Sequence, residues 1–276
     1  MSGALEGLRF ALAGPGKVGR SLASWLTAAG AKLEVVVGRD DATRLPSLSH
    51  LDLLLVAVPD PALAAVATQL AATGTAPTVA LHTSGSRDAA VLAPLRQQGA
   101  AVGSFHPLKA FPRPLLEPLS ARGVVFGIDG DDAALALARR LAQALEAETV
   151  AVPAEARRLY HFAATFAAGG VVTLVAAAFS LATRAGVSGG VLAGYTELAR
   201  GALEEVGRAG EPIAALTGPV ARGDVATVEA ALAALAAHDP EALPFARALV
   251  QESIRQLRRR GTLSIGQEAV ARLVTP

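Results

Sequence analysis

Short apolar runs alternate with longer amphipathic segments over the first 152 residues of the chain. Runs such as "FALA", "LEVVV" and "LDLLLVAV" are typical of strands, and the segments between them repeat apolar residues at helical spacing. This alternation predicts a parallel sheet with crossover helices. The predicted strands are residues 9–13, 33–37, 53–58, 78–81, 101–104, 124–128 and 149–152, and the predicted helices are residues 18–29, 61–72, 88–98 and 132–146.

The strand pattern stops at Pro153, a residue that suits the first turn of a helix. Helical signals continue to the end of the sequence, where Ser264 and Gln267 have the spacing of a capping box. The sequence therefore predicts an α/β protein with two parts. A Rossmann-type, mostly parallel sheet domain over residues 1–152 precedes an all-α helical domain over residues 153–276.

An uncharged segment, residues 162–183, lies early in the helical part. With ~20 residues it is long enough to span a bilayer. Its residues are mostly Ala, Gly and Thr, which transfer weakly into lipid, and it continues directly from the Arg-rich "AEARRLYH". We therefore expect a core or interface helix in preference to a membrane span. Because one small helical bundle offers limited apolar surface, the segment also predicts a homodimer that buries it.

Composition narrows the class of protein. The chain has 25 basic and 24 acidic residues, and no basic stripe interleaved with aromatic residues occurs in the sequence. Nucleic acid is therefore not expected as a partner. Cysteine is absent, which excludes disulfides and thiolate chemistry. The opening "MSGALEGLRF" leads into a strand pattern and does not have the form of a signal peptide, so a cytoplasmic location is expected.

A glycine-rich motif, "AGPGKVG", follows the first predicted strand and precedes an amphipathic helix, as dinucleotide-binding loops do. Gly14 would permit the tight turn, Gly16 would let the backbone approach a pyrophosphate, and Gly19 would let the helix pack on the strand. The helix N-terminus would offer free N–H groups to the phosphates. The candidate cofactor-binding residues of this loop are Gly14, Pro15, Gly16, Lys17, Val18 and Gly19.

The end of the second predicted strand indicates which dinucleotide is bound. An NAD site usually presents an acidic residue there, whereas an NADP site has a small residue and an arginine. The position holds Gly38, followed by Arg39, so NADP (NADPH) is the expected cofactor and Arg39 the expected contact to its 2′-phosphate. Glu34 has the spacing of the acidic residue but begins the strand, which favours an ordinary solvated residue.

The third predicted strand ends on Val58 and Pro59, which would place rigid backbone at the carboxyl edge of the sheet. Val58 and Pro59 are therefore candidate cofactor-binding residues. Pro59 and Asp60 would lie near the nicotinamide ribose. Alternatively, Pro59 only ends the strand and Asp60 caps the next helix.

Two apolar runs end on a histidine, one at His82 and one at His106. Carboxyl ends of neighbouring strands line one crevice, so both histidines are expected to border it unless they are simply packed in the core. His82, Thr83 and Ser84 are the candidate wall of the cofactor site. No metal is expected, because the histidines lack the spacing of metal ligands. These histidines are His50, His82, His106, His161 and His238.

Six motifs, in this order, resemble the Rossmann-like bacterial proteins whose C-terminal half is the domain of unknown function 2520. They are "AGPGKVGRSL", "VAVPDPAL", "LHTSGS", "GSFHPLKAF", "RRLYHFAATFAA" and "ALTGPVARGD". The resemblance implies an NADP-binding domain and a helical domain similar to the C-terminal domain of 6-phosphogluconate dehydrogenase. It also implies kinship with ketopantoate reductases, pyrroline-5-carboxylate reductases and β-hydroxyacid dehydrogenases, which usually dimerise through their helical domains.

Two places depart from the pattern of these relatives. Lys109 stands where they commonly have Gln, and Ala168 and Gly169 stand where they often have Ser-Asn. The related dehydrogenases often use an Asn at about that place in the helix. Its replacement here favours an alternative in which the chain is a non-catalytic, dinucleotide-binding regulatory protein.

A reductase of this kind needs a proton donor beside the nicotinamide. His161, on the helix expected to cover the cleft, is the first candidate and His106 the second, because an imidazole can titrate near neutral pH. Lys109 or Arg157 could bind a substrate carboxylate. In a purely structural interpretation, Tyr160 and His161 pack the helix against the sheet.

The sequence thus predicts an NADP-dependent oxidoreductase that reduces a small polar substrate. The leading substrate class is a 2-oxo acid of the ketopantoate type, and the alternative within enzymes is a cyclic imine of the pyrroline type. The candidate catalytic residues are His161, His106 and Lys109.

Overall fold

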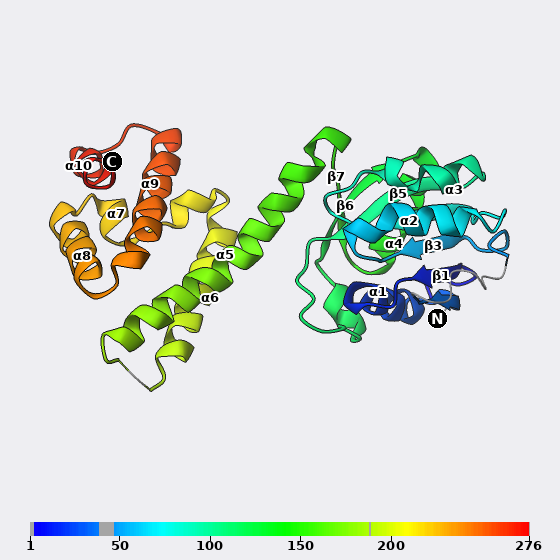
Figure 1. Ribbon diagram of the computed structural model, residues 1–276, viewed down its shortest axis with the longest axis horizontal. Coiled ribbons are helices and arrows are strands. Elements are labelled where there is room, and N and C mark those ends of the chain that lie inside the picture. The colour runs from blue at the N-terminus through cyan, green and yellow to red at the C-terminus, as the bar shows by residue number, and fades with distance from the viewer. Residues whose placement is uncertain (1–2, 39–46, 188, 276) are drawn as a thin grey trace. The chain divides into compact units, whose positions relative to one another are not determined.

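The computed structural model describes residues 3–38, 47–187 and 189–275. The chain divides into two compact units, Met1–Ala168 and Gly169–Pro276, whose elements are labelled in Figure 1. The border expected at residue 152 lies just after the last strand, whereas the units divide inside the helix α5 (Arg157–Arg184). The early turns of α5 belong to the first unit because Arg157 and Tyr160 contact its strands.

A seven-stranded sheet forms the first unit, in the order β2-β1-β3-β4-β5-β6-β7. Strands β1 to β5 are parallel, β6 is antiparallel to β5, and β7 is parallel to β6. The predicted mostly parallel sheet is confirmed. The strands are β1 (Arg9–Ala13), β2 (Lys32–Val37), β3 (Leu53–Val56), β4 (Val79–His82), β5 (Ala101–Pro107), β6 (Val125–Gly130) and β7 (Glu148–Ala151).

Strand β5 is longer than the sequence predicts. It continues past Ser104 to Pro107 because the antiparallel β6 pairs with it over this stretch, so His106 lies opposite Gly127 within the sheet. The predicted helix 88–98 is also different, since a 3₁₀ turn, η2 (Ala89–Leu92), precedes the short helix α3 (Ala93–Gln97). Pro94 suits the first turn of α3, where its missing N–H costs nothing.

Helices cover both faces of the sheet. Phe10 and Leu12 of β1 pack in one core cluster with residues of α1 (Lys17–Ala28) and α4 (Asp132–Ala144). The alternate residues of the strand, Ala11 and Ala13, pack in a second cluster with α2 (Asp60–Ala71) and α3. This alternation follows from the two-residue period of a strand. A 3₁₀ turn, η3 (Pro118–Ala121), lies between β5 and β6 in the sequence.

The strand order fixes the position of the ligand crevice. From β1 the chain moves to β2 on one side of the sheet and then returns to β3 on the other side. In open α/β sheets ligands bind at such a reversal, outside the carboxyl ends of the strands. The loops that follow β1, β3, β4 and β5 therefore lie at the expected site.

The second unit is helical throughout its described residues, as predicted. Its capping box is confirmed, because Ser264 accepts the backbone N–H of Gln267 while the Gln267 side chain accepts the backbone N–H of Ser264. A core of Val228, Ile254 and Val270 joins three of the helices. Beyond α5 the helices are α6 (Val191–Ala209), α7 (Gly218–Arg222), α8 (Val225–His238), α9 (Leu243–Arg260) and α10 (Ile265–Val274), with 3₁₀ turns η5 (Pro212–Ala215) and η6 (Pro240–Ala242). The 3₁₀ turn η4 (Ala154–Ala156) precedes α5, in the first unit.

Helix α5 is strongly apolar and exposed. The helical stretch Ala154–Arg184 is long and apolar enough to cross a membrane by length and composition alone, with a mean hydropathy of 2.0 over its most apolar window. Within the single chain none of that window is buried, and Phe162, Phe166 and Val172 are 62%, 68% and 70% exposed. Within the described residues of the single chain this window is therefore not buried as a core helix would be, and the alternative of an interface helix stays a prediction.

Candidate functional site

The glycine-rich loop has the geometry that its sequence predicts. Gly14 has a φ of +92°, and a Cβ there would lie 2.6 Å from the carbonyl oxygen of Ala57. A Cβ on Gly19 would overlap the carbonyl oxygen of Gly14. Gly16, the residue that precedes α1, has open space where its side chain would be, and no side chain caps the helix. The loop therefore has room for a pyrophosphate at a free helix N-terminus.

A cleft with a volume of about 400 Å³ opens beside this loop. Its size falls in the range of small-molecule sites, about 300 to 1,000 Å³. The loops after β1, β3 and β4 and the end of β5 meet there with the first turns of α5. The lining residues are Gly16, Lys17, Val18, Ala57, Val58, Pro59, Asp60, Thr83, Ser84, Gly85, His106, Pro107, Lys109, Phe111 and His161.

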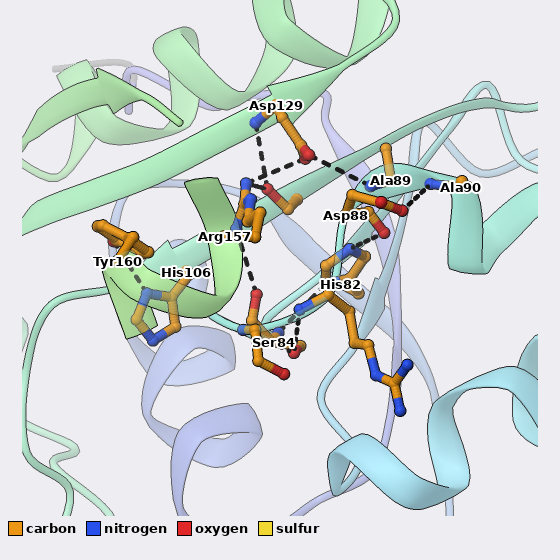
Figure 2. A network of polar contacts seen from close by, with 12 residues as sticks. His82, Ser84, Asp88, Ala89, Ala90, His106, Asp129, Arg157 and Tyr160 are labelled. Carbon is orange, nitrogen blue, oxygen red and sulfur yellow. Dashed lines mark hydrogen bonds and ion pairs between the residues drawn. The ribbon is translucent and has the colours of Figure 1, made fainter. Parts of the chain in front are cut away.

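His82 does not line this cleft, contrary to expectation. Its side chain is fully buried at the end of β4, where Nδ1 accepts the backbone N–H of Ser84 and Nε2 lies 3.0 Å from the carbonyl oxygen of Asp88 (Figure 2). Burial lowers the pKa of His82 to about 4, so the ring is neutral at pH 7. Its two hydrogen bonds hold the loop of residues 83–88 against the sheet, and Thr83 and Ser84 line the cleft in its place.

Asp60 is the acidic group of the cleft. It is the first residue of α2, and its carboxylate accepts a hydrogen bond from the Ser86 hydroxyl. Burial alone would raise the pKa of Asp60, but hydrogen bonds from Ser86 and Ser84 and the charge of His161 lower it below its ordinary value. The cleft therefore holds an ionised carboxylate at neutral pH. The sequence analysis placed Asp60 near the nicotinamide ribose or at the cap of the next helix. It did not predict the hydrogen bond from Ser86, because Ser86 follows a different strand.

His106 projects from β5 and pairs with a tyrosine. Its Nδ1 lies 3.0 Å from the hydroxyl oxygen of Tyr160 on α5 (Figure 2). Burial, followed by the charges of His161 and Arg157, lowers the pKa of His106 to about 4, so this imidazole is neutral at pH 7. Tyr160 has a specific polar contact with the sheet, which the purely structural interpretation of this residue did not include.

His161 lies against the same cleft from α5. The rings of His106 and His161 meet edge to face with their centroids 5.5 Å apart. Gly85 lies close to both rings, since a Cβ there would overlap Nδ1 of His161 and lie 2.7 Å from Nε2 of His106. The Nδ1 atom of His161 is buried and has no hydrogen-bond partner within the described part of the chain.

Arg157 has a structural role, which corrects its interpretation as a substrate-binding residue. The side chain is 1% exposed and forms an ion pair with Asp129 of β6 at 3.0 Å. It also donates hydrogen bonds to the Ser104 hydroxyl and the Ser84 carbonyl (Figure 2). The guanidinium therefore fixes the start of α5 to the ends of β4, β5 and β6, and it is not free to bind a ligand.

The remaining predicted residues have different outcomes. Lys109 lies on the cleft wall, as do Lys17 and Pro59.

Glu34 forms ion pairs with Arg9 and Lys32, whose hydrogen bonds lower the pKa of Glu34 to about 2, so it is a structural strand residue. Pro15 is part of the glycine-rich loop but not of the cleft lining. Arg39, the expected contact to the 2′-phosphate, lies outside the described residues.

Family comparison gives two matches along the chain. Residues 6–107 match a Rossmann-like domain, and residues 124–253 match the domain of unknown function 2520. A search of curated proteins finds no significant match.

Solved structures with the same fold cover almost all of the chain. A putative NADP oxidoreductase from Bacteroides fragilis is 20% identical, with a TM-score of 0.71 over 91% of this chain and 98% of its own. An imine reductase from Streptomyces aurantiacus is 15% identical, with a TM-score of 0.64 over 97% and 100%. The pyrroline carboxylate reductase of Plasmodium falciparum, with NADP bound, is 11% identical, with a TM-score of 0.61 over 98% and 99%. The chain therefore matches a Rossmann-like domain in its first part and the domain of unknown function 2520 in its second part, as its sequence motifs predicted.

Proposed function

We propose that the protein is an NADP-dependent oxidoreductase that reduces a small polar substrate. The observation that carries the proposal is the cleft, in which the glycine-rich loop and the side chains of His106 and His161 border one space at the carboxyl edge of the sheet. When bound, the nicotinamide would supply hydride. The residues from Gly14 to Gly19 would hold its pyrophosphate, and His161 would donate the proton that completes the reduction.

The substrate class to test first is a 2-oxo acid of the ketopantoate type. Lys109 is the residue that would bind its carboxylate, because Arg157 is occupied by Asp129. The experiment is a screen of NADPH oxidation by the purified protein against a panel of 2-oxo acids and cyclic imines. Turnover with a member of the panel supports the proposal. NADPH binding without turnover on any compound favours a non-catalytic regulatory protein instead.

A cyclic imine is the second candidate substrate. Reduction of an imine proceeds through its protonated, positively charged form, and the ionised carboxylate of Asp60 lines the cleft where that charge would be stabilised. Two of the structures with this fold are named as imine and pyrroline carboxylate reductases. Turnover of imines but not of 2-oxo acids in the same panel would favour this candidate.

Cofactor selectivity provides a prediction about Arg39. We expect NADPH to bind more tightly than NADH, because Arg39 follows the second strand where an arginine can meet the 2′-phosphate. Arg39→Ala should narrow the difference, since a charge-assisted contact is worth on the order of 1.5 to 3 kcal/mol. Calorimetric titration of both cofactors checks this. Equal affinities of the unmodified protein for NADPH and NADH would contradict the assignment.

Assembly provides a second prediction. We expect a homodimer that buries the exposed face of α5, because large apolar patches on a folded surface mark interaction sites. The rings of Phe162 and Phe166 contact each other on this face, with their centroids 6.1 Å apart. Phe166→Glu should shift the protein to a monomer in light scattering at micromolar concentration. The matched control is Leu119→Glu, which changes an exposed leucine of η3 and should leave the dimer intact.

A monodisperse monomer of the unmodified protein in the same measurement would show that α5 has another role.

A further inference from the structure

The hydrogen atom of the His106 imidazole has a defined position. The ring is neutral at pH 7, because its burial lowers the pKa of His106 to about 4. A neutral imidazole carries one N–H, and the hydrogen bond made by one ring nitrogen decides which nitrogen carries it. In this site the nitrogen with a partner is Nδ1, which lies 3.0 Å from the hydroxyl of Tyr160.

The Tyr160 hydroxyl is itself constrained by the sheet. Burial raises the pKa of Tyr160, so the phenol keeps its proton at neutral pH. The nearby backbone of Gly127 lowers that pKa in part. Gly127 can approach so closely because it has no side chain, and a Cβ there would overlap the Tyr160 hydroxyl.

The contact between Tyr160 and His106 has a defined direction. Among the described residues, Nδ1 of His106 is the acceptor within hydrogen-bond distance of the Tyr160 hydroxyl, so the O–H is directed to it. Nδ1 then accepts and Nε2 carries the proton. Nε2 lies on the side of the ring away from Tyr160 (Figure 2), close to Gly85, and both His106 and Gly85 line the cleft.

We propose that Tyr160 is a positioning residue that holds His106 in the tautomer with its proton on Nε2, where the N–H is directed to the reducible group of the substrate. His106 then acts as a neutral hydrogen-bond donor that polarises the substrate double bond. His161 remains free to be the proton donor. The catalytic part of this inference rests on the proposed reductase function, whereas the tautomer itself does not.

Nitrogen NMR of the protein labelled at its histidines tests the tautomer directly. In the unmodified protein we expect a protonated, pyrrole-type signal at Nε2 of His106 and an unprotonated, pyridine-type signal at Nδ1. Tyr160→Phe should give a mixture of the two tautomers of His106, which shifts its Nδ1 and Nε2 signals at the same time. The matched control is Tyr195→Phe, which removes the other tyrosine hydroxyl, on α6, and should leave the His106 signals unchanged.

A second variant keeps the phenol but displaces it. Gly127→Ala adds a methyl group where the Tyr160 hydroxyl lies, so it should shift the His106 signals in the same direction as Tyr160→Phe. If the protein is a reductase, both variants should lower kcat about tenfold, the effect of one lost hydrogen bond, with KM and NADPH affinity nearly unchanged.

Protonated Nδ1 in the unmodified protein, or His106 signals that do not respond to Tyr160→Phe, would overturn the inference. Absence of turnover on every substrate together with the expected NMR signals would instead count against the proposed function and leave the positioning role standing.

Discussion

His161→Ala should lower kcat by roughly 10²- to 10⁴-fold, the usual contribution of a general acid. The physical reason is its position, with one ring nitrogen buried against Gly85 and the ring on the wall of the cleft. Affinity for NADPH should stay nearly unchanged, because the glycine-rich loop is untouched. Steady-state kinetics with the substrate found in the panel, together with calorimetric titration of NADPH, measures both quantities.

His238→Ala is the control for this prediction. It removes the histidine that ends α8, which is exposed, and it should leave kcat unchanged. A structure of the complex with the His161 ring more than about 10 Å from the nicotinamide C4 would reject the assignment, because a general acid must act within hydrogen-bond reach or through one water.

Arg157→Ala should destabilise the first unit by on the order of 3 kcal/mol, the cost of removing one partner of a buried ion pair. Arg157 is 1% exposed and its partner Asp129 is 14% exposed, and the substitution would leave Asp129 without this cation beside it. Chemical denaturation followed by circular dichroism measures the free energy of unfolding. The loss should be partly reversed in the double variant Arg157→Met with Asp129→Leu, which removes both charges.

Arg158→Ala is the matched control, since this neighbouring arginine is exposed and makes no ion pair among the described residues. Surface substitutions usually change stability by less than about 0.5 kcal/mol. An equal decrease in the free energy of unfolding for Arg157→Ala and Arg158→Ala would show that the buried ion pair does not anchor α5.

The order and type of elements could be predicted from the sequence because strands and helices differ in apolar period. Phe10 and Leu12 alternate with Ala11 and Ala13 along a strand buried on both faces, and each pair joins a different core. The extension of β5 to Pro107 could not be predicted, because it depends on pairing with β6, more than a dozen residues later. A local sequence pattern gives no information about which distant strand a segment pairs with.

The part of the candidate site that one local motif forms could be predicted from the sequence. The contacts between segments that are distant in the sequence could not. Gly14 and Gly19 behave as their motif implies, since each approaches a neighbouring carbonyl too closely for a side chain. His82 resembled His106 in sequence, yet its ring bonds to its own loop and is buried. The ion pair of Arg157 with Asp129 joins a helix to a strand, and the sequence around Arg157 gives no signal of this distant partner.

The close packing at Gly85 has an evolutionary consequence. A methyl group at this position would strike both imidazoles, so residues 85, 106 and 161 cannot change independently while the histidines stay neighbours. In an alignment of relatives, we expect glycine at this position wherever both histidines occur, and larger residues only where one histidine has been replaced. The identity of this one residue would then separate relatives that keep the paired-histidine chemistry from those that have lost or exchanged it.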